Sequence, residues 1–277
     1  MRWLVLVLIA ACNGTPGGSG GDDVGGGDDA HPMIDSGSSG SDGQPGVRGV
    51  FHPDVTEVVV EIDYETGAEP YTGQVIGSGD TFELSATNLD RLFAGKKMIT
   101  LPRTTATMEN IGAVPDQEIT VQDIIALAAL HRGQADTPTR KTYYIVFVGG
   151  HFTDANGPNP NVLGVSLGGS GVIALFKDVI RSSGGVVGNV ARYVEQSTLI
   201  HEIAHSIGLV DNGVVMVTPH KDTTHGAHCT NDRCVMYWLN EGANDAAAFV
   251  QQNVLTGNTV LFDAACLQDV DALTGGP

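Results

Sequence analysis

Basic residues are scarce in this 277-residue chain, which has 14 Lys and Arg against 32 Asp and Glu. The formal net charge at pH 7 is −18, and no Lys/Arg-rich stretch is present. Proteins that bind nucleic acid concentrate such residues on one face, so we expect no nucleic-acid partner. Strong acidity favours solubility but does not identify a substrate.

Long apolar runs are also lacking. Residues 3–11 form an apolar run much shorter than the ~20 residues that cross a bilayer. The run follows Arg2 and ends in two alanines before Cys12, which is typical of an export signal. Ile9-Ala10-Ala11-Cys12 also resembles the lipobox of bacterial lipoproteins, in which the cysteine is acylated and becomes the mature N-terminus. The resemblance implies a lipid anchor at Cys12. The alternatives are an ordinary signal peptide and a buried apolar stretch.

The segment 13–47 is poor in apolar residues and rich in Gly, Ser, Asp and Pro. Such a segment cannot bury enough surface to offset the entropy of ordering it, and its aspartates repel one another. The spacing of a calcium loop is absent. We therefore divide the chain into a signal peptide with its cysteine at 1–12, a disordered tether at 13–47 and a folded domain at 48–277. Asn13 is not an aspartate, so by its resemblance to lipoprotein sorting signals the anchor is expected in the outer membrane where a cell has two.

The folded part is predicted to mix strands and helices, and no internal repeat is apparent. Runs of β-branched and apolar residues predict extended segments at 56–64, 97–102, 142–148, 161–167 and 171–176. Helical spacing of apolar residues predicts helices at 88–94, 120–131, 190–207 and 245–253. Strands and helices mixed before one long helix indicate an α+β domain with a twisted sheet.

The candidate catalytic residues lie in the predicted helix 190–207. His201 and His205 are four residues apart, so both imidazoles project from the same face and can hold one metal ion. Glu202 lies beside His201, where it can hydrogen-bond a water on the metal rather than bind the metal. Zinc lowers the pKa of such a water to about 7, and a carboxylate takes its proton as it attacks a carbonyl. Two histidines merely buried in a core are the alternative.

This stretch resembles the metzincins, whose pattern is His-Glu-x-x-His-x-x-Gly-x-x-His/Asp followed by a methionine turn. His201, Glu202, His205 and Gly208 match it, and Asp211 falls at the third-ligand position, where snapalysins also carry aspartate. Gly208 can adopt a positive φ, end the helix and turn the chain sharply.

A second resemblance competes for the third ligand. The run His228-Cys229-x4-Cys234-x-Met236 is similar to that of the archaemetzincins, in which the histidine is the third zinc ligand and the methionine forms the turn. An insertion, residues 209–227, separates it from Gly208. We favour His228 because its distance to Met236 reproduces the family pattern, and Asp211 stays the alternative because it also begins a good turn sequence. Two further histidines are outside candidates, His220 and His225.

Cysteines are few, and three follow the helix: Cys229, Cys234 and Cys266. In archaemetzincins the first two bind a second, structural zinc together with a downstream Cys-x-x-Cys, which this chain lacks. A second zinc site is therefore not expected. In an oxidising compartment we expect a disulfide, with Cys229–Cys234 the nearest pairing and Cys266 left over, and the sequence leaves the pairing open.

The resemblance implies a metzincin-like zincin of α+β class: a twisted mixed sheet packed on a long active-site helix, then a methionine turn at Met236 and a C-terminal helix. Residues 164–174 are the candidate edge strand for bound peptide. The leading hypothesis is a monomeric, lipid-anchored zinc metalloendopeptidase that cleaves extracytoplasmic proteins. The alternatives are a non-catalytic surface lipoprotein with a structural zinc, and a zinc hydrolase of a non-peptide bond.

Overall fold

The computed structural model describes residues 49–75, 79–93, 95–184 and 189–275. The predicted signal segment 1–12 with Cys12, and the predicted tether 13–47, lie outside the described residues, so these domain boundaries stay predictions. None of the helices in the described ranges combines the length and the apolarity that a bilayer crossing needs.

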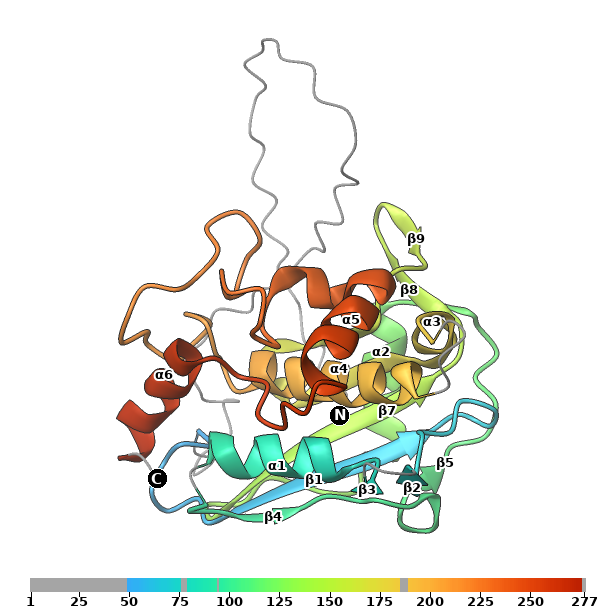
Figure 1. The fold of residues 1–277 in the computed structure, drawn as a ribbon. Helices are drawn as coiled ribbons and strands as arrows, with labels where there is room; N and C mark the ends of the chain where they lie inside the picture. The colour runs from blue at the N-terminus through green and yellow to red at the C-terminus, as the bar shows by residue number, and fades with distance from the viewer. Residues whose placement is uncertain (1–48, 76–78, 94, 185–188, 276–277) are drawn as a thin grey trace, which may run out of the picture. The chain divides into compact units, whose positions relative to one another are not determined.

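Six strands form the central sheet (Figure 1). β1 (Glu57–Tyr64) and β7 (Arg140–Val148) pair in parallel along their length in its middle. β4 (Met98–Thr100) and β5 (Glu109–Asn110) run parallel to β1 on its other side. Both long strands are mostly buried, as expected for parallel strands covered on two faces.

β10 (Gly164–Ser166) is the edge strand on the other side of β7. It pairs antiparallel with β11 (Val172–Phe176), which runs parallel to β7, and η2 (Gly168–Ser170) joins the two. The predicted extended segments 161–167 and 171–176 thus form an antiparallel hairpin. Among the described residues β10 has no strand partner on its outer side, so backbone groups there are available to an extended chain.

Shorter segments connect these strands. They are β2 (Gln74–Val75), β3 (Gly79–Asp80), η1 (Thr105–Thr107), β6 (Glu118–Ile119), β8 (His151–Asp154) and β9 (Gly157–Asn159). β2 and β3 pair with each other, and β6, β8 and β9 form a small separate sheet.

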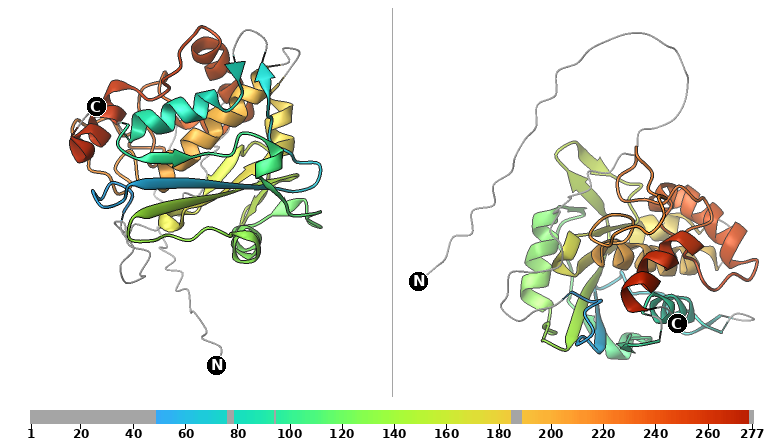
Figure 2. Two further views of the ribbon diagram at one scale, coloured as in Figure 1. Left: turned by 90° about the horizontal axis from the view of Figure 1, so that it is seen from below. Right: turned by 90° about the vertical axis from the view of Figure 1, so that its left-hand side faces the viewer.

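The described residues form six α-helices: α1 (Glu83–Leu92), α2 (Val121–His131), α3 (Lys177–Ser182), α4 (Val190–Ser206), α5 (Ala243–Phe249) and α6 (Ala264–Thr274). Figures 1 and 2 show α1 and α4 on one face of the sheet and α2 on the opposite face. α4 contacts α1, α5, β10 and β11, and all its residues except Arg192 are buried. A helix enclosed in this way can hold polar side chains in fixed positions away from water.

The α+β class is confirmed, and the differences from the predicted elements are local. α2 begins at the predicted threonine, where Thr120 and Asp123 form a reciprocal capping box. α1 begins at Glu83 rather than at 88, because Leu84 and Ser85 extend its buried face towards the N-terminus. After α5 the chain continues into a π-helical turn, η4 (Val250–Val254). α6 was not predicted from the sequence.

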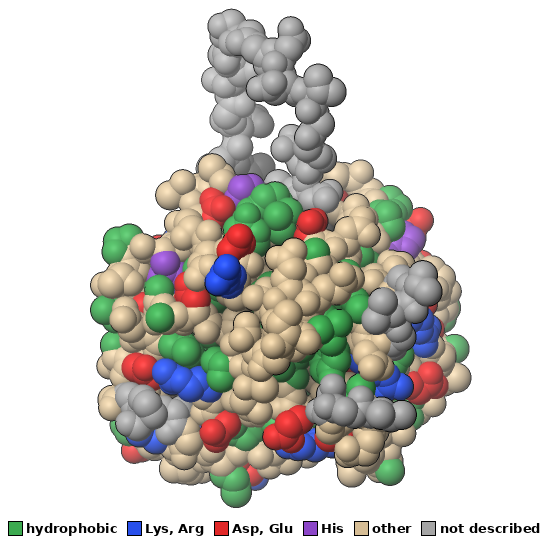
Figure 3. All heavy atoms as spheres, in the orientation of Figure 1, with side chains coloured by type: hydrophobic (Ala, Val, Ile, Leu, Met, Phe, Trp, Pro, Cys, Tyr) green, Lys and Arg blue, Asp and Glu red, His purple; other side chains and the backbone are tan. Residues whose placement is uncertain are grey.

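Acidic and basic side chains are spread over the face seen in Figure 3, without a broad patch of one sign among the coloured residues. Several form ion pairs, such as Arg91 with Asp271 at 2.9 Å and Arg103 with Glu83 at 2.8 Å. The absence of a nucleic-acid partner stays a prediction.

A buried ion pair connects α3 to α4. Lys177 and Glu195 are both fully buried and are hydrogen-bonded to each other. The Lys177 ammonium also lies 3.4 Å from the centroid of the Tyr71 ring, and the Tyr71 N–H donates to Glu195 at 2.7 Å. The two charges therefore depend on each other, because neither is in contact with water.

Replacing Lys177 by methionine should lower the free energy of unfolding by about 3–5 kcal/mol, because Glu195 would stay buried without its cation. Urea denaturation monitored by circular dichroism measures the change. The control is Arg181→Met on the same helix, whose exposed ion pair with Asp178 should contribute less than about 1 kcal/mol. The double variant Lys177→Met/Glu195→Leu should recover most of the loss; a double variant as unstable as the single one would contradict this account.

Candidate metal centre

The C-terminal half of α4 places His201 and His205 side by side. Their Nε2 atoms lie 2.9 Å apart, and the side chains are buried. α4 ends at Ser206, and Gly208 then turns the chain with a φ of +91°. A Cβ at Gly208 would lie 2.7 Å from the backbone oxygen of Asn212, so both the dihedral angle and the space require glycine there.

His228 is the third histidine at this position. Its Nε2 lies 3.2 Å from that of His205, and the ring of His228 stacks on that of His201 with centroids 5.3 Å apart. His228 is 1% exposed. Three imidazole nitrogens from a helix and a distant loop therefore converge on one buried point.

Asp211 does not join them. Its side chain is 56% exposed and lies 3.4 Å from Lys221 Nζ. Val210 and Asp211 both have positive φ, 56° and 59°, so the chain leaves the helix in a tight turn away from the histidines. The two outside candidates have other partners: His225 stacks on Trp238, and His220 lies 3.5 Å from Asp269.

A carboxylate that the sequence analysis missed, Glu241, completes the group. It ends η3 (Trp238–Glu241), and its Oε1 lies 3.0 Å from His228 Nε2 and 3.9 Å from His201 Nε2. One ligand atom from each of His201, His205, His228 and Glu241 lies within 4.8 Å of the others. The sequence signal is a carboxylate five residues after Met236, which spacing alone does not distinguish from a surface residue.

Backbone carbonyls orient two of the three histidines, one of them from the turn around Met236. His201 Nδ1 lies 2.7 Å from the Val235 carbonyl, which also accepts from the Asn240 amide at 3.1 Å. His228 Nδ1 is bonded to the His225 carbonyl. These bonds leave Nε2 of both rings free to bind a metal, an arrangement common among zinc ligands. Met236 is fully buried, and its carbonyl accepts the Cys229 N–H at 2.7 Å, which connects this turn to His228.

Burial and neighbouring charges shift the titration of these side chains. Burial, and then the charge of Glu241, raise the pKa of Glu202 well above its usual range. Burial, and then the proximity of His201 and His228, lower the pKa of His205 well below its usual range. A neutral imidazole is the form that binds a metal.

Glu202 lies against the edge strand. A Cβ on Gly164 would lie 2.9 Å from Glu202 Cγ and 3.0 Å from Thr198 Cγ2. Glycine at the start of β10 thus lets the strand pass directly over the carboxylate. An extended chain paired with the outer edge of β10 would run close to Glu202 and the histidines.

The four ligand atoms fit a zinc ion. Two unprotonated imidazole nitrogens 2.9 Å apart repel each other unless a proton or a cation lies between them. Tetrahedral zinc with bonds of about 2.0–2.1 Å holds neighbouring ligands about 3.3–3.4 Å apart, close to the spacing of these atoms. Nitrogen and carboxylate donors also suit zinc.

Three cysteines and an aspartate form a second group, and the predicted Cys229–Cys234 disulfide is not formed. Cys229, Cys234 and Cys266 are free cysteines, and with Asp263 they place ligand atoms within 4.8 Å of one another. Cys234 Sγ lies 3.5 Å from Cys266 Sγ, and Cys229 Sγ lies 3.4 Å from Asp263. The first turn of α6 supplies Asp263 and Cys266 at the spacing of a Cys-x-x-Cys pair, so the group can hold a metal without that motif.

Replacing Cys266 by serine should lower the zinc content by one ion per chain. It should also lower the free energy of unfolding by about 4 kcal/mol when free zinc is 1,000-fold above its dissociation constant, because bound metal stabilises only the folded state. Metal analysis and thermal denaturation measure both effects. Ala264→Ser, exposed on the same helix, is the control. Equal zinc content in the Cys266 variant and the control would contradict a metal site here.

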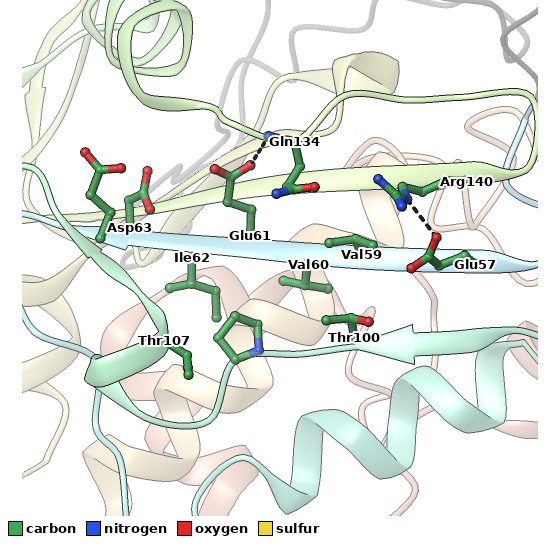
Figure 4. A pocket seen from close by; sticks show the side chains of 12 residues that line it. Glu57, Val59, Val60, Glu61, Ile62, Asp63, Thr100, Thr107, Gln134 and Arg140 are labelled. Carbon is green, nitrogen blue, oxygen red and sulfur yellow. Dashed lines mark hydrogen bonds and ion pairs between the residues drawn. The ribbon is translucent and has the colours of Figure 1, made fainter.

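A hollow of about 410 Å³ along β1, lined also by Thr100 and Thr107, is a weaker candidate. Figure 4 shows Glu61 and Asp63 on one side of β1 and Val60 and Ile62 on the other. Burial raises the pKa of Asp63 to about 6. Glu57 pairs with Arg140, and Glu61 accepts two backbone N–H groups, so these carboxylates already have partners. Among the described residues the hollow contains no group of three metal-ligand atoms within 4.8 Å.

No protein-family model matches the chain, and no curated protein sequence matches it. Comparison with solved structures finds the crystal structure of archaemetzincin from Archaeoglobus fulgidus, complexed with malonate. The two are 15% identical over 77% of this chain and 99% of that chain, with a TM-score of 0.38. At this level of similarity, conclusions about activity depend on the geometry of the site.

Proposed function

We propose that this protein is a zinc-dependent metallopeptidase that hydrolyses peptide bonds in proteins. The observation that carries the proposal is the convergence of His201, His205 and His228 on one buried point, with Glu202 beside it and the free edge of β10 alongside. The sequence of residues 1–47 supports the further proposal that it acts outside the cytoplasm, held to a membrane through Cys12.

The side chains have separate roles in this mechanism. His201, His205 and His228 would hold zinc, which supplies a Lewis acid for the scissile carbonyl and lowers the pKa of water. Glu202 accepts the proton of the attacking water and then donates it to the leaving amine. The outer edge of β10 aligns the peptide through backbone hydrogen bonds.

One observation favours a second candidate, a non-catalytic protein with a structural metal. Glu241 brings the number of ligand side chains to four, and closed four-ligand sites are typical of structural zinc. A structural site, however, has no use for the buried Glu202 carboxylate beside the ligands. The peptidase proposal accounts for both Glu202 and the adjacent strand edge.

The test is cleavage of a denatured, fluorescently labelled protein by the full chain, measured together with its zinc content. We expect cleavage that a zinc chelator abolishes and that added zinc restores, because the histidines bind the ion reversibly. Bound zinc without cleavage of any peptide would favour the structural-metal candidate or a non-peptide substrate. A protein that binds no zinc would contradict the proposal.

A further inference from the structure

Glu241, not Glu202, is the carboxylate within ligand distance of the three histidines. Its Oε1 lies 3.0 Å from His228 Nε2, and all four ligand atoms lie within 4.8 Å of one another. Glu202 is not a member of this group. The two carboxylates therefore occupy different positions: Glu241 lies among the nitrogen atoms of the three histidines, and Glu202 lies against Gly164 of β10.

The backbone holds Glu241 in place. Its carbonyl accepts the N–H of Leu163 at 3.3 Å, and the next residue, Gly242, forms a β-bridge with Val162. Asn240 donates to the carbonyls of Cys234 and Val235 from the same turn. The Glu241 side chain is 17% exposed, so it is partly shielded from water.

These contacts connect Glu241 to the strand edge. Val162 and Leu163 lead directly into β10, whose first residue, Gly164, lies over Glu202. An extended chain that pairs with β10 would therefore act on the same backbone segment that positions Glu241.

We propose that Glu241 is the fourth protein ligand of the zinc in the resting protein. It occupies the coordination position that water or a substrate carbonyl needs, and the site opens when the carboxylate is displaced. This inference rests on the proposed function, because a resting ligand must leave for hydrolysis to occur. Catalytic zinc sites keep one position open, so closure by a side chain makes the resting protein latent.

The test uses the full-length protein loaded with Co²⁺ in place of zinc, because visible absorption of Co²⁺ reports the number and kind of its ligands. Glu241→Ala should change the spectrum and weaken zinc binding by about tenfold or more. It should also strengthen azide binding to the metal by about tenfold, since a position is opened. Glu241→Gln tests the same point with the shape of the side chain preserved. Asp245→Ala, an exposed carboxylate four residues further on, is the control with the same charge change.

The inference would be overturned if the Co²⁺ spectrum, the zinc affinity and the azide affinity were the same in wild type, in both Glu241 variants and in the control. If Glu241→Ala fails to fold, the outcome depends on Glu241→Gln alone. Failure of the proposed function has a different signature, because the wild-type protein would then bind no metal or cleave no peptide. A wild type that binds zinc and cleaves peptide while the Glu241 variants are unchanged would overturn the inference alone.

Discussion

Replacing Glu202 by glutamine should lower the rate of peptide cleavage by about 10²–10⁴-fold, the usual contribution of a general base. The amide has nearly the same shape, so it should fit under Gly164, but it cannot take a proton from water. Zinc content should be unchanged, because Glu202 lies outside the group of ligand atoms. Cleavage of a fluorescent peptide and metal analysis on the same sample measure both quantities.

The matched control is Glu83→Gln, an exposed glutamate at the start of α1 that pairs with Arg103. It should cleave at the wild-type rate. A Glu202→Gln variant that keeps more than about a tenth of the activity would remove this residue from the mechanism. Loss of zinc together with activity would instead make Glu202 a ligand or a structural residue.

His228→Ala should abolish stable zinc binding at the histidine site, with the affinity of that site lowered by more than the 10–100-fold typical of changes outside the ligand sphere. The reason is that one of three converging imidazoles would be lost, while Glu241 would lose its 3.0 Å partner. Equilibrium dialysis against a zinc buffer measures the affinity, and circular dichroism checks the fold.

Asp211→Ala distinguishes the two candidates for the third ligand. The Asp211 carboxylate is exposed and faces Lys221, so its removal should leave zinc affinity within about twofold of wild type. The reverse result, with zinc lost in Asp211→Ala and kept in His228→Ala, would return the third position to the aspartate.

Local patterns in the sequence were sufficient to predict the position of a side chain where a single helix or strand determines it. His201 and His205 share one face of α4 because a helix repeats every 3.6 residues, whatever packs around it. The capping box at Thr120 and the buried strand β7 were likewise predictable from a few consecutive residues. α1 was placed too far along the chain because its first turn packs against other elements rather than following a strong cap signal.

Contacts between distant segments were not predictable in this way. Glu241 is forty residues from His201 in the sequence, and backbone contacts of its turn with Val162 and Leu163, from another part of the chain, help to hold it near the histidines. The disulfide prediction rested on the nearness of Cys229 and Cys234 in sequence, whereas in the structure the thiols are free and α6 brings Cys266 and Asp263 against them.

The sequence by itself determined that this protein has an α+β fold with a His-Glu-x-x-His helix, because strand alternation, helix periodicity and turn chemistry act over a few residues. Only the tertiary structure brought His228 and Glu241, rather than Asp211, close to His201 and His205, and placed three thiols and a carboxylate in a second group. These features depend on where the loops that carry the side chains pack against the core. Packing and backbone hydrogen bonds over the whole domain determine the positions of those loops, and the spacing of residues along the chain does not predict them.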